Sequence, residues 1–171
     1  VDGADATARV RERFPCGELV GRSPALARAL ELASLAALAD SPVLLTGPSG
    51  TGKSLLARAI TRGGTRRDAP FVELNCAALP SELIESELFG ATRGAHSTAS
   101  VARAGLVAAA EGGTLFLDEL AELPSAAQAK LLHLTQTGSY HRLGDDSVRR
   151  ANVRIIAATN AEVTGADASK L

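Results

Sequence analysis

The residues best suited to chemistry form one short run with the spacing G-x-x-x-x-G-K-S. The run consists of Gly47, Pro48, Ser49, Gly50, Thr51, Gly52, Lys53 and Ser54. Glycines at these positions let backbone N–H groups converge on an anion, and the lysine ammonium adds a positive charge. A serine hydroxyl directly after the lysine can ligate Mg²⁺. The spacing therefore predicts a cradle for the phosphates of a nucleotide.

The flanking sequence favours a phosphate cradle over a glycine-rich turn without a ligand. An apolar segment, 43–46, precedes the run, and a helical pattern, 53–62, follows it. This strand and helix are the context that the motif requires, because the helix N-terminus adds a partial positive charge. At average composition, the bare spacing would arise by chance in under ~1% of chains of this length.

Two adjacent acids, Asp118 and Glu119, end another apolar segment that begins at Thr114. Open α/β sheets bind ligands beyond the carboxyl ends of their strands, so we expect this strand to lie beside the 43–46 strand. We assign Asp118 to the Mg²⁺ shell and Glu119 to orienting and deprotonating the attacking water. An acid pair at a strand end is by itself more often a solvated boundary, and the phosphate cradle reverses that preference.

Two asparagines are placed to reach the same edge of the sheet. Asn75 ends one apolar segment and Asn160 follows another. Each alone would more often be a turn former or a helix cap. Their shared placement favours a polar sensor of the nucleotide.

The elements that must position these residues alternate along the chain. The expected strands are 43–46, 71–75, 114–118 and 153–158, and the expected helices are 24–38, 53–62, 81–89, 101–110 and 125–135. Ser23 and Pro24 supply a plausible N-cap and first helical position. The alternation predicts an α/β fold, a parallel sheet with helices on both faces. We expect residues 1–18 to be an irregular lead-in, residues 19–171 to be one nucleotide-binding domain, and 90–100 and 138–152 to be irregular.

Composition narrows the function classes. The 171-residue chain is 46% hydrophobic, has a formal net charge of −1 and has a pI of about 6.3. It contains no apolar run of bilayer-spanning length, so we expect a cytoplasmic protein without membrane contact. A net charge this close to zero does not indicate that the chain binds DNA by itself. Cys16 and Cys76 lack metal-ligand spacing and carry no functional prediction.

Taken together, the motifs resemble the AAA+ domain of bacterial enhancer-binding proteins, the ATPases that remodel sigma-54 RNA polymerase. Besides the cradle and the acid pair, the resemblance is carried by Leu19-Val20-Gly21-Arg22-Ser23-Pro24, the segment 70–79, Glu85-Ser86-Glu87-Leu88-Phe89-Gly90 and Ala158-Thr159-Asn160. It covers the chain from about Leu19 onward.

The resemblance implies roles for several residues. Val20 and Gly21 would line the adenine pocket, Asn75 would restrain Glu119, and Thr159 with Asn160 would form sensor I. It also implies ATP and Mg²⁺ as ligands, homo-oligomers related to hexameric rings, and DNA contact only through a domain outside this chain. The family's arginine fingers, last sheet strand, helical lid and sensor II would follow beyond Leu171.

The family's loop that grips sigma-54 corresponds here to Gly94, Ala95, His96, Ser97, Thr98 and Ala99. An aromatic position is taken by His96 and the second glycine by Thr98, which changes both contact chemistry and flexibility. Ser54 stands where the family usually has Glu, and it is the general P-loop choice. Two alternatives to a sigma-54 remodelling motor follow: an ATPase with another client, and a nucleotide-sensing module without turnover. For Arg149, Arg150 and Arg154 we expect solvated or subunit-facing ion pairs.

Overall fold

The computed structural model describes residues 3–93 and 102–160. The helices are α1 Gly3–Arg11, α2 Pro24–Ala37, α3 Lys53–Arg62, α4 Ser81–Phe89, α5 Leu106–Ala109 and α6 Ser125–Thr137, with two 3-10 turns, η1 Cys76–Ala78 and η2 Leu120–Glu122. The strands are β1 Val43–Thr46, β2 Phe71–Asn75, β3 Thr114–Asp118, β4 Ser139–Tyr140, β5 Arg149–Arg150 and β6 Arg154–Thr159. Among these residues, no helix combines the length and apolarity needed to cross a membrane.

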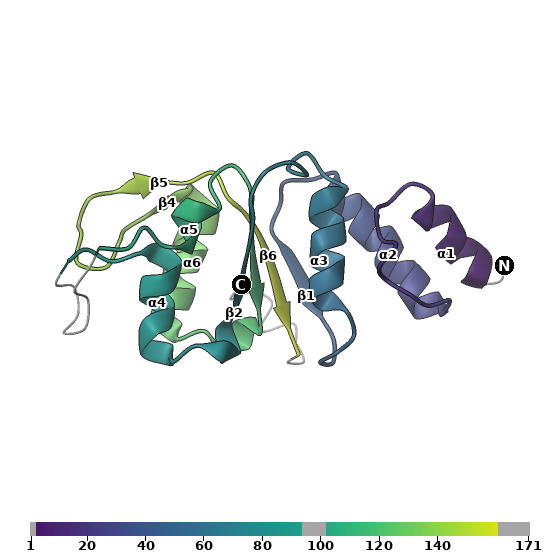
Figure 1. The fold of residues 1–171 in the computed structure, drawn as a ribbon, viewed down its shortest axis with the longest axis horizontal. Helices are drawn as coiled ribbons and strands as arrows, with labels where there is room; N and C mark the ends of the chain where they lie inside the picture. Colours follow the sequence, from purple (N-terminus) through teal and green to yellow (C-terminus); the bar gives the residue numbers. More distant parts are fainter. Residues whose placement is uncertain (1–2, 94–101, 161–171) are drawn as a thin grey trace.

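Four strands form one parallel sheet in the order β1-β6-β3-β2. Helices α2 and α3 cover one face, and α4, α5 and α6 cover the other (Figure 1). This arrangement confirms the predicted α/β fold. The prediction that β3 lies beside β1 was wrong, because β6 separates them. Strand order depends on the paths of the connections, which the apolar pattern of each strand does not encode.

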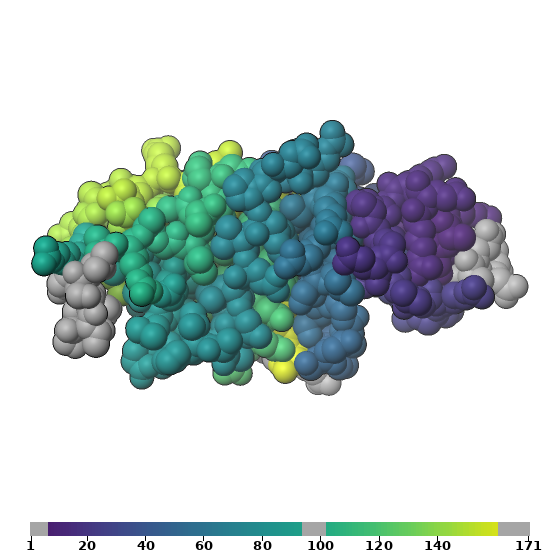
Figure 2. Space-filling view, in the orientation of Figure 1, coloured from purple at the N-terminus to yellow at the C-terminus, as the bar shows by residue number. Residues whose placement is uncertain are grey.

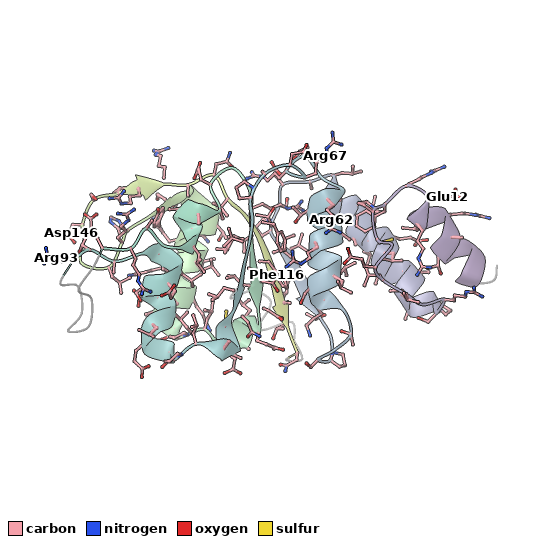
Figure 3. All side chains as sticks on the ribbon, in the orientation of Figure 1. Glu12, Arg62, Arg67, Arg93, Phe116 and Asp146 are labelled. Carbon is pink, nitrogen blue, oxygen red and sulfur yellow. The ribbon has the colours of Figure 1, made fainter. Side chains whose placement is uncertain are left out.

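The central strands contribute side chains to two separate hydrophobic cores, one on each face of the sheet, because neighbouring residues of a strand point to opposite faces. Leu115 and Leu117 pack with the α4 and α6 side, whereas Phe116, between them, packs with Leu30 and Ile60 of α2 and α3. Phe116 lies near the middle of the molecule (Figure 3). Burial on both faces explains why β3 reads as a continuous apolar run.

Most predicted boundaries agree with the structure. Strands β1, β2 and β3 and helices α3 and α4 have the predicted limits, and β6 is shifted by one residue. Helix α2 begins as predicted, since the Ser23 hydroxyl accepts a hydrogen bond from the Leu26 N–H at 3.2 Å. Both cysteines are buried and free.

Three segments differ from the sequence-based prediction. Residues 3–11, expected to be irregular, form α1, which packs on α2. The helix expected over 101–110 is limited to Leu106–Ala109, because Gly105 has a φ of 83° and Arg103 pairs instead with Ala91 through two backbone hydrogen bonds. Within the expected irregular stretch 138–152, β4 and β5 pair as a short antiparallel ribbon.

The amino ends of the strands are joined by a network centred on Arg66, whose side chain is 14% exposed. Its guanidinium donates to the backbone oxygens of Gly113 (3.1 Å) and Asn152 (3.0 Å) and pairs with Asp40 (3.2 Å). The buried Arg154 donates to the Ala36 carbonyl at 2.6 Å, at the C-terminal end of α2, so the ion pair expected for it was wrong. Arg149 does form an ion pair, with Asp145 at 3.4 Å.

Candidate functional site

The phosphate-cradle sequence lies at the carboxyl end of β1 and turns directly into α3. Gly50 and Gly52 adopt φ angles of 78° and 88°, which glycine reaches without the clash that a Cβ would cause. Gly52 is the N-cap of α3, and no side chain caps the helix there. The first N–H groups of α3 are therefore left to a ligand, and the partial positive charge of the helix end favours an anion.

Lys53 lies across the loop that it follows. Its ammonium donates to the carbonyl oxygens of Gly47 (2.9 Å) and Pro48 (3.1 Å). The Thr51 hydroxyl donates to the Pro48 carbonyl at 2.8 Å, which closes the turn. The ammonium is thus held over the same loop whose N–H groups would contact phosphate, where it can exchange carbonyl partners for phosphate oxygens.

The acid pair ends β3, two strands away from β1. The Glu119 N–H donates to Asp118 Oδ1 at 3.0 Å, which fixes the Asp118 carboxylate at the strand end. Glu119 has φ 53° and ψ 52°, and among the described residues it is the one non-glycine residue with a positive φ. A left-handed glutamate is strained by on the order of 1 kcal/mol, a cost that structures commonly retain at functional positions.

The predicted sensors lie on the strands that flank the acid pair. Asn75 is the register partner of Asp118, and its side-chain oxygen accepts from the Ala77 N–H at 3.0 Å. Within the described residues, no hydrogen bond joins Asn75 to Glu119. On the other side, the Thr159 carbonyl accepts from the Gly47 N–H at 3.2 Å, and the exposed Asn160 follows it. Strand β6 therefore places both sensor I candidates between the cradle and the acids.

A cavity of about 570 Å³ extends from the phosphate loop along α2. Its wall contains Gly47, Pro48 and Lys53 on one side and Leu19, Ser23 and Leu26 on the other. A cavity of this size is ordinary for a small-molecule site. Val20, predicted to line an adenine pocket, is 90% exposed and is absent from the wall, as is Gly21.

Two residues near this cavity were missed from the sequence. Leu19 is 7% exposed and packs against the phosphate loop, where a Cβ on Gly52 would lie 3.1 Å from it. Arg11, on α1, donates to the carbonyl oxygens of Leu19 and Gly21. The apolar character of Leu19 was a usable signal, whereas nothing local in the sequence marks Arg11.

Mg²⁺ in nucleotide sites is held by one or two protein oxygens together with substrate phosphates and water. The donor types here fit that requirement: the Ser54 hydroxyl is in the first turn of α3, and the Asp118 carboxylate is at the end of β3. The described residues contain no group of three or more metal-binding side chains. The site therefore suits a metal that arrives with a nucleotide.

Cys76 is the nucleophilic side chain nearest in sequence to Asn75, the predicted sensor. Burial, and then the charges of Asp118, Glu119 and Glu122, raise the pKa of its thiol to about 12. The thiol therefore stays protonated near neutral pH, where a nucleophile would need to be a thiolate.

The fold and the site together define a P-loop nucleotide-binding domain of the AAA+ type: a parallel sheet with the cradle, the candidate sensors and the acids at the carboxyl ends of four adjacent strands. The model of the sigma-54 interaction domain family matches residues 19–170. The chain belongs to this family, the AAA+ ATPase domains of sigma-54-dependent transcriptional activators.

Sequence relatives agree with this assignment. The chain is 55% identical over 144 residues to the nitric oxide reductase transcription regulator NorR2 of Cupriavidus necator, covering 84% of this chain and 28% of that protein. It is 45% identical over 155 residues to the Nif-specific regulatory protein of Rhizobium leguminosarum bv. trifolii, covering 91% and 44%. The chain thus spans less than half of either relative.

Solved structures show the same architecture. NtrX from Brucella abortus in complex with ATP superposes with a TM-score of 0.78 at 35% identity, covering 88% of this chain and 32% of that one. The same protein in complex with ADP gives 0.78 at 33% identity, covering 95% and 35%. The predicted sigma-54 contact residues 94–99 lie outside the described residues.

Proposed function

We propose that this chain binds ATP with Mg²⁺ and hydrolyses it at the carboxyl edge of the sheet. The observation that carries the proposal is the uncapped N-terminus of α3 beneath the Gly47–Ser54 loop, facing a sheet edge that also bears Asp118 and Glu119. The phosphates would lie on the loop amides and Lys53, and the base would enter the cavity along α2. The ATP and ADP complexes of NtrX support this choice of nucleotide.

In this proposal the bound Mg²⁺ neutralises charge on the phosphates, with Ser54 and Asp118 as its protein oxygens. Glu119 orients and deprotonates the attacking water. Asn75 and Asn160, on either side of the acids, detect loss of the γ-phosphate, and Val20, Gly21 and Thr159 complete the nucleotide contacts. Asn75 would have to exchange its bond with the Ala77 N–H to restrain Glu119.

Turnover distinguishes an ATPase from a module that only senses nucleotide. We expect the chain to release phosphate from ATP, faster at higher protein concentration if neighbouring subunits complete the site. Glu119→Gln should lower the rate at least ~100-fold while leaving ATP affinity within about twofold, because the amide cannot take a proton. Glu122→Gln, on an exposed residue of η2, is the matched control. Nucleotide binding without turnover at any concentration would favour the sensing module.

We further propose that hydrolysis remodels sigma-54 RNA polymerase through residues 94–99, within a homo-oligomeric ring. Family membership supports this partner. A photo-crosslinker at position 96 should capture sigma-54 in an ATP-analogue-dependent manner. Capture of another protein, with no sigma-54 in any nucleotide state, would favour the alternative of a different client, which the residues His96 and Thr98 motivate.

A further inference from the structure

Arg11, the last residue of α1, makes a bridge to the wall of the cavity. Its Nη2 atom donates to the Leu19 carbonyl at 2.6 Å and to the Gly21 carbonyl at 3.0 Å. Its Nε atom is buried and has no hydrogen-bond partner among the described residues. The side chain of Arg11 is therefore held by the bonds from Nη2 to these two carbonyl oxygens. Helix α1 precedes residues 19–170, the part of the chain that matches the family.

The bridged segment is confined on two sides. Leu19 packs against Gly52 of the phosphate loop, and Gly21 lies so close to α2 that a Cβ there would be 2.7 Å from the Leu26 side chain. Leu19 and Leu26 both line the cavity. Leu19 is therefore a wall residue whose position relative to the phosphate loop is set by its contact with Gly52, by the contact of Gly21 with Leu26 and by the two hydrogen bonds from Arg11.

The bridge also fixes the direction of backbone donors. A trans peptide group is planar, so its N–H points away from its C=O. Because the Leu19 carbonyl faces Arg11, the Val20 N–H points away from Arg11, and the Gly21 carbonyl fixes the Arg22 N–H in the same way. Within the described residues, neither N–H donates a hydrogen bond. Both are therefore backbone donors without a partner among the described residues, and the Val20 N–H lies next in sequence to Leu19, which lines the cavity.

We propose that Arg11 is a positioning residue for the nucleotide base, acting through the backbone of Leu19–Gly21; this inference rests on the proposed binding of ATP. Arg11 donates no hydrogen bond to the phosphate loop, whose Thr51 and Lys53 side chains are held by bonds within the loop itself. A helix before the family domain thereby sets how well the base end of the pocket is formed. A change in α1 would alter base recognition and leave phosphate binding unchanged.

The test compares two ligands on the 171-residue chain. Calorimetry with ATP reports base and phosphate contacts, whereas inorganic tripolyphosphate reports phosphate contacts alone. Arg11→Met retains the apolar stem and removes the donors, and Arg11→Lys restores one donor. Arg13→Met is the matched control, because Arg13 is exposed just beyond the same helix. If the released segment is correctly ordered about one-tenth of the time, ATP affinity falls about tenfold.

We expect ATP affinity to fall about tenfold in Arg11→Met and by less in Arg11→Lys. The affinity for tripolyphosphate should be unchanged in all variants. Equal ATP affinity in Arg11→Met and the parent would overturn the proposal, as would equal losses for both ligands, which a purely structural role would give. If Arg11→Met does not fold, as judged by circular dichroism, the comparison of Arg11→Lys with the parent decides in the same way. Failure of the parent chain to bind ATP would instead overturn the proposed function.

Discussion

The two ends of the parallel sheet satisfy their polar side chains in different ways. At the amino ends, Arg66 and Arg154 bond to partners 26 to 118 residues away in sequence. At the carboxyl ends, side-chain hydrogen bonds of Lys53, Thr51, Asn75 and Asp118 reach only one to six residues along the chain.

We infer that the amino ends of the strands contribute mainly to the stability of the fold and the carboxyl ends mainly to ligand binding. Long-range bonds cross-link distant segments, and losing them removes charge-assisted hydrogen bonds that hold those segments together. Short-range bonds hold a side chain in place without tying it to the rest of the fold, so it can change partners when a ligand arrives. The carboxyl end should therefore tolerate substitutions that abolish function, whereas the amino end should not tolerate loss of its cross-links.

The largest effect is expected from Arg66→Ala. It removes two hydrogen bonds from a charged donor, to the carbonyls of Gly113 and Asn152, and breaks the ion pair with the exposed Asp40, so the free energy of unfolding should fall by about 3 kcal/mol. ATP affinity of the folded protein should not change. Urea denaturation measures the first quantity and calorimetry the second. The control is Arg67→Ala, on a side chain that is 70% exposed and points outward (Figure 3), which should stay within about 0.5 kcal/mol.

Lys53→Ala should show the reverse pattern. Losing a charged donor to phosphate should weaken ATP binding by about 2 kcal/mol, close to thirtyfold, while the unfolding free energy without ligand changes by less than about 0.5 kcal/mol. Lys130→Ala, which removes an ion pair with Glu85 on α4, should leave ATP affinity unchanged. A large loss of stability in Lys53→Ala would break the distinction between the two ends.

Glu119→Gly tests the strain at the acid. Glycine reaches φ 53° without penalty, so the variant should be about 0.5–1 kcal/mol more stable, whereas under the proposed mechanism it should not hydrolyse ATP. Glu122→Gly, in the adjoining 3-10 turn at an ordinary φ, should instead be destabilised by a similar amount. Thermal denaturation of both variants shows whether the stability changes have these opposite signs. Destabilisation of both to the same degree would contradict the presence of strain.

The smallest effect is a pH dependence at the amino end. The hydrogen bond from Arg66 holds the pKa of Asp40 below its usual value. A carboxyl whose pKa is lower in the folded state contributes stability above its unfolded pKa, and that contribution is lost as pH falls through the folded pKa. Below about pH 4, Asp40→Asn should therefore lose stability less steeply than the parent. In the Arg66→Ala background, Asp40→Asn should change the slope less, because Arg66 is the main cause of the lowered pKa of Asp40 and Arg154 and Thr65 contribute further.

Local sequence patterns predicted much of the fold and the cradle. The Gly47–Ser54 spacing, the apolar runs before Asp118 and Asn75 and the Ser23 cap all depend on near neighbours, and the structure places these elements as expected. What failed depends on distant partners. The bond from Arg154 to Ala36, the position of β6 between β1 and β3, and the pairing of Arg103 with Ala91 leave no periodic signal.

Short elements were the other source of error. Strands β4 and β5 have two residues each, too few to show alternation, and α5 has four, too few to fill one face. Helix α1 was missed because its charged, alanine-rich sequence has no strong apolar period. It packs on α2, which can stabilise a helix of weak intrinsic pattern. Figure 2 shows this N-terminal segment gathered at one end of the molecule.

The hydrogen bond from the Gly47 amide to the Thr159 carbonyl couples two parts of the site mechanically. The loop that would hold the phosphates and the strand end that would detect their loss are anchored to each other, and β6 is paired with its neighbours on both sides. The phosphate loop and the carboxyl ends of β1 and β6 are therefore joined in one hydrogen-bonded unit. If the chain hydrolyses ATP as proposed, a movement coupled to loss of the γ-phosphate would have to arise in the connections between the strands, because these strand ends are bonded to one another.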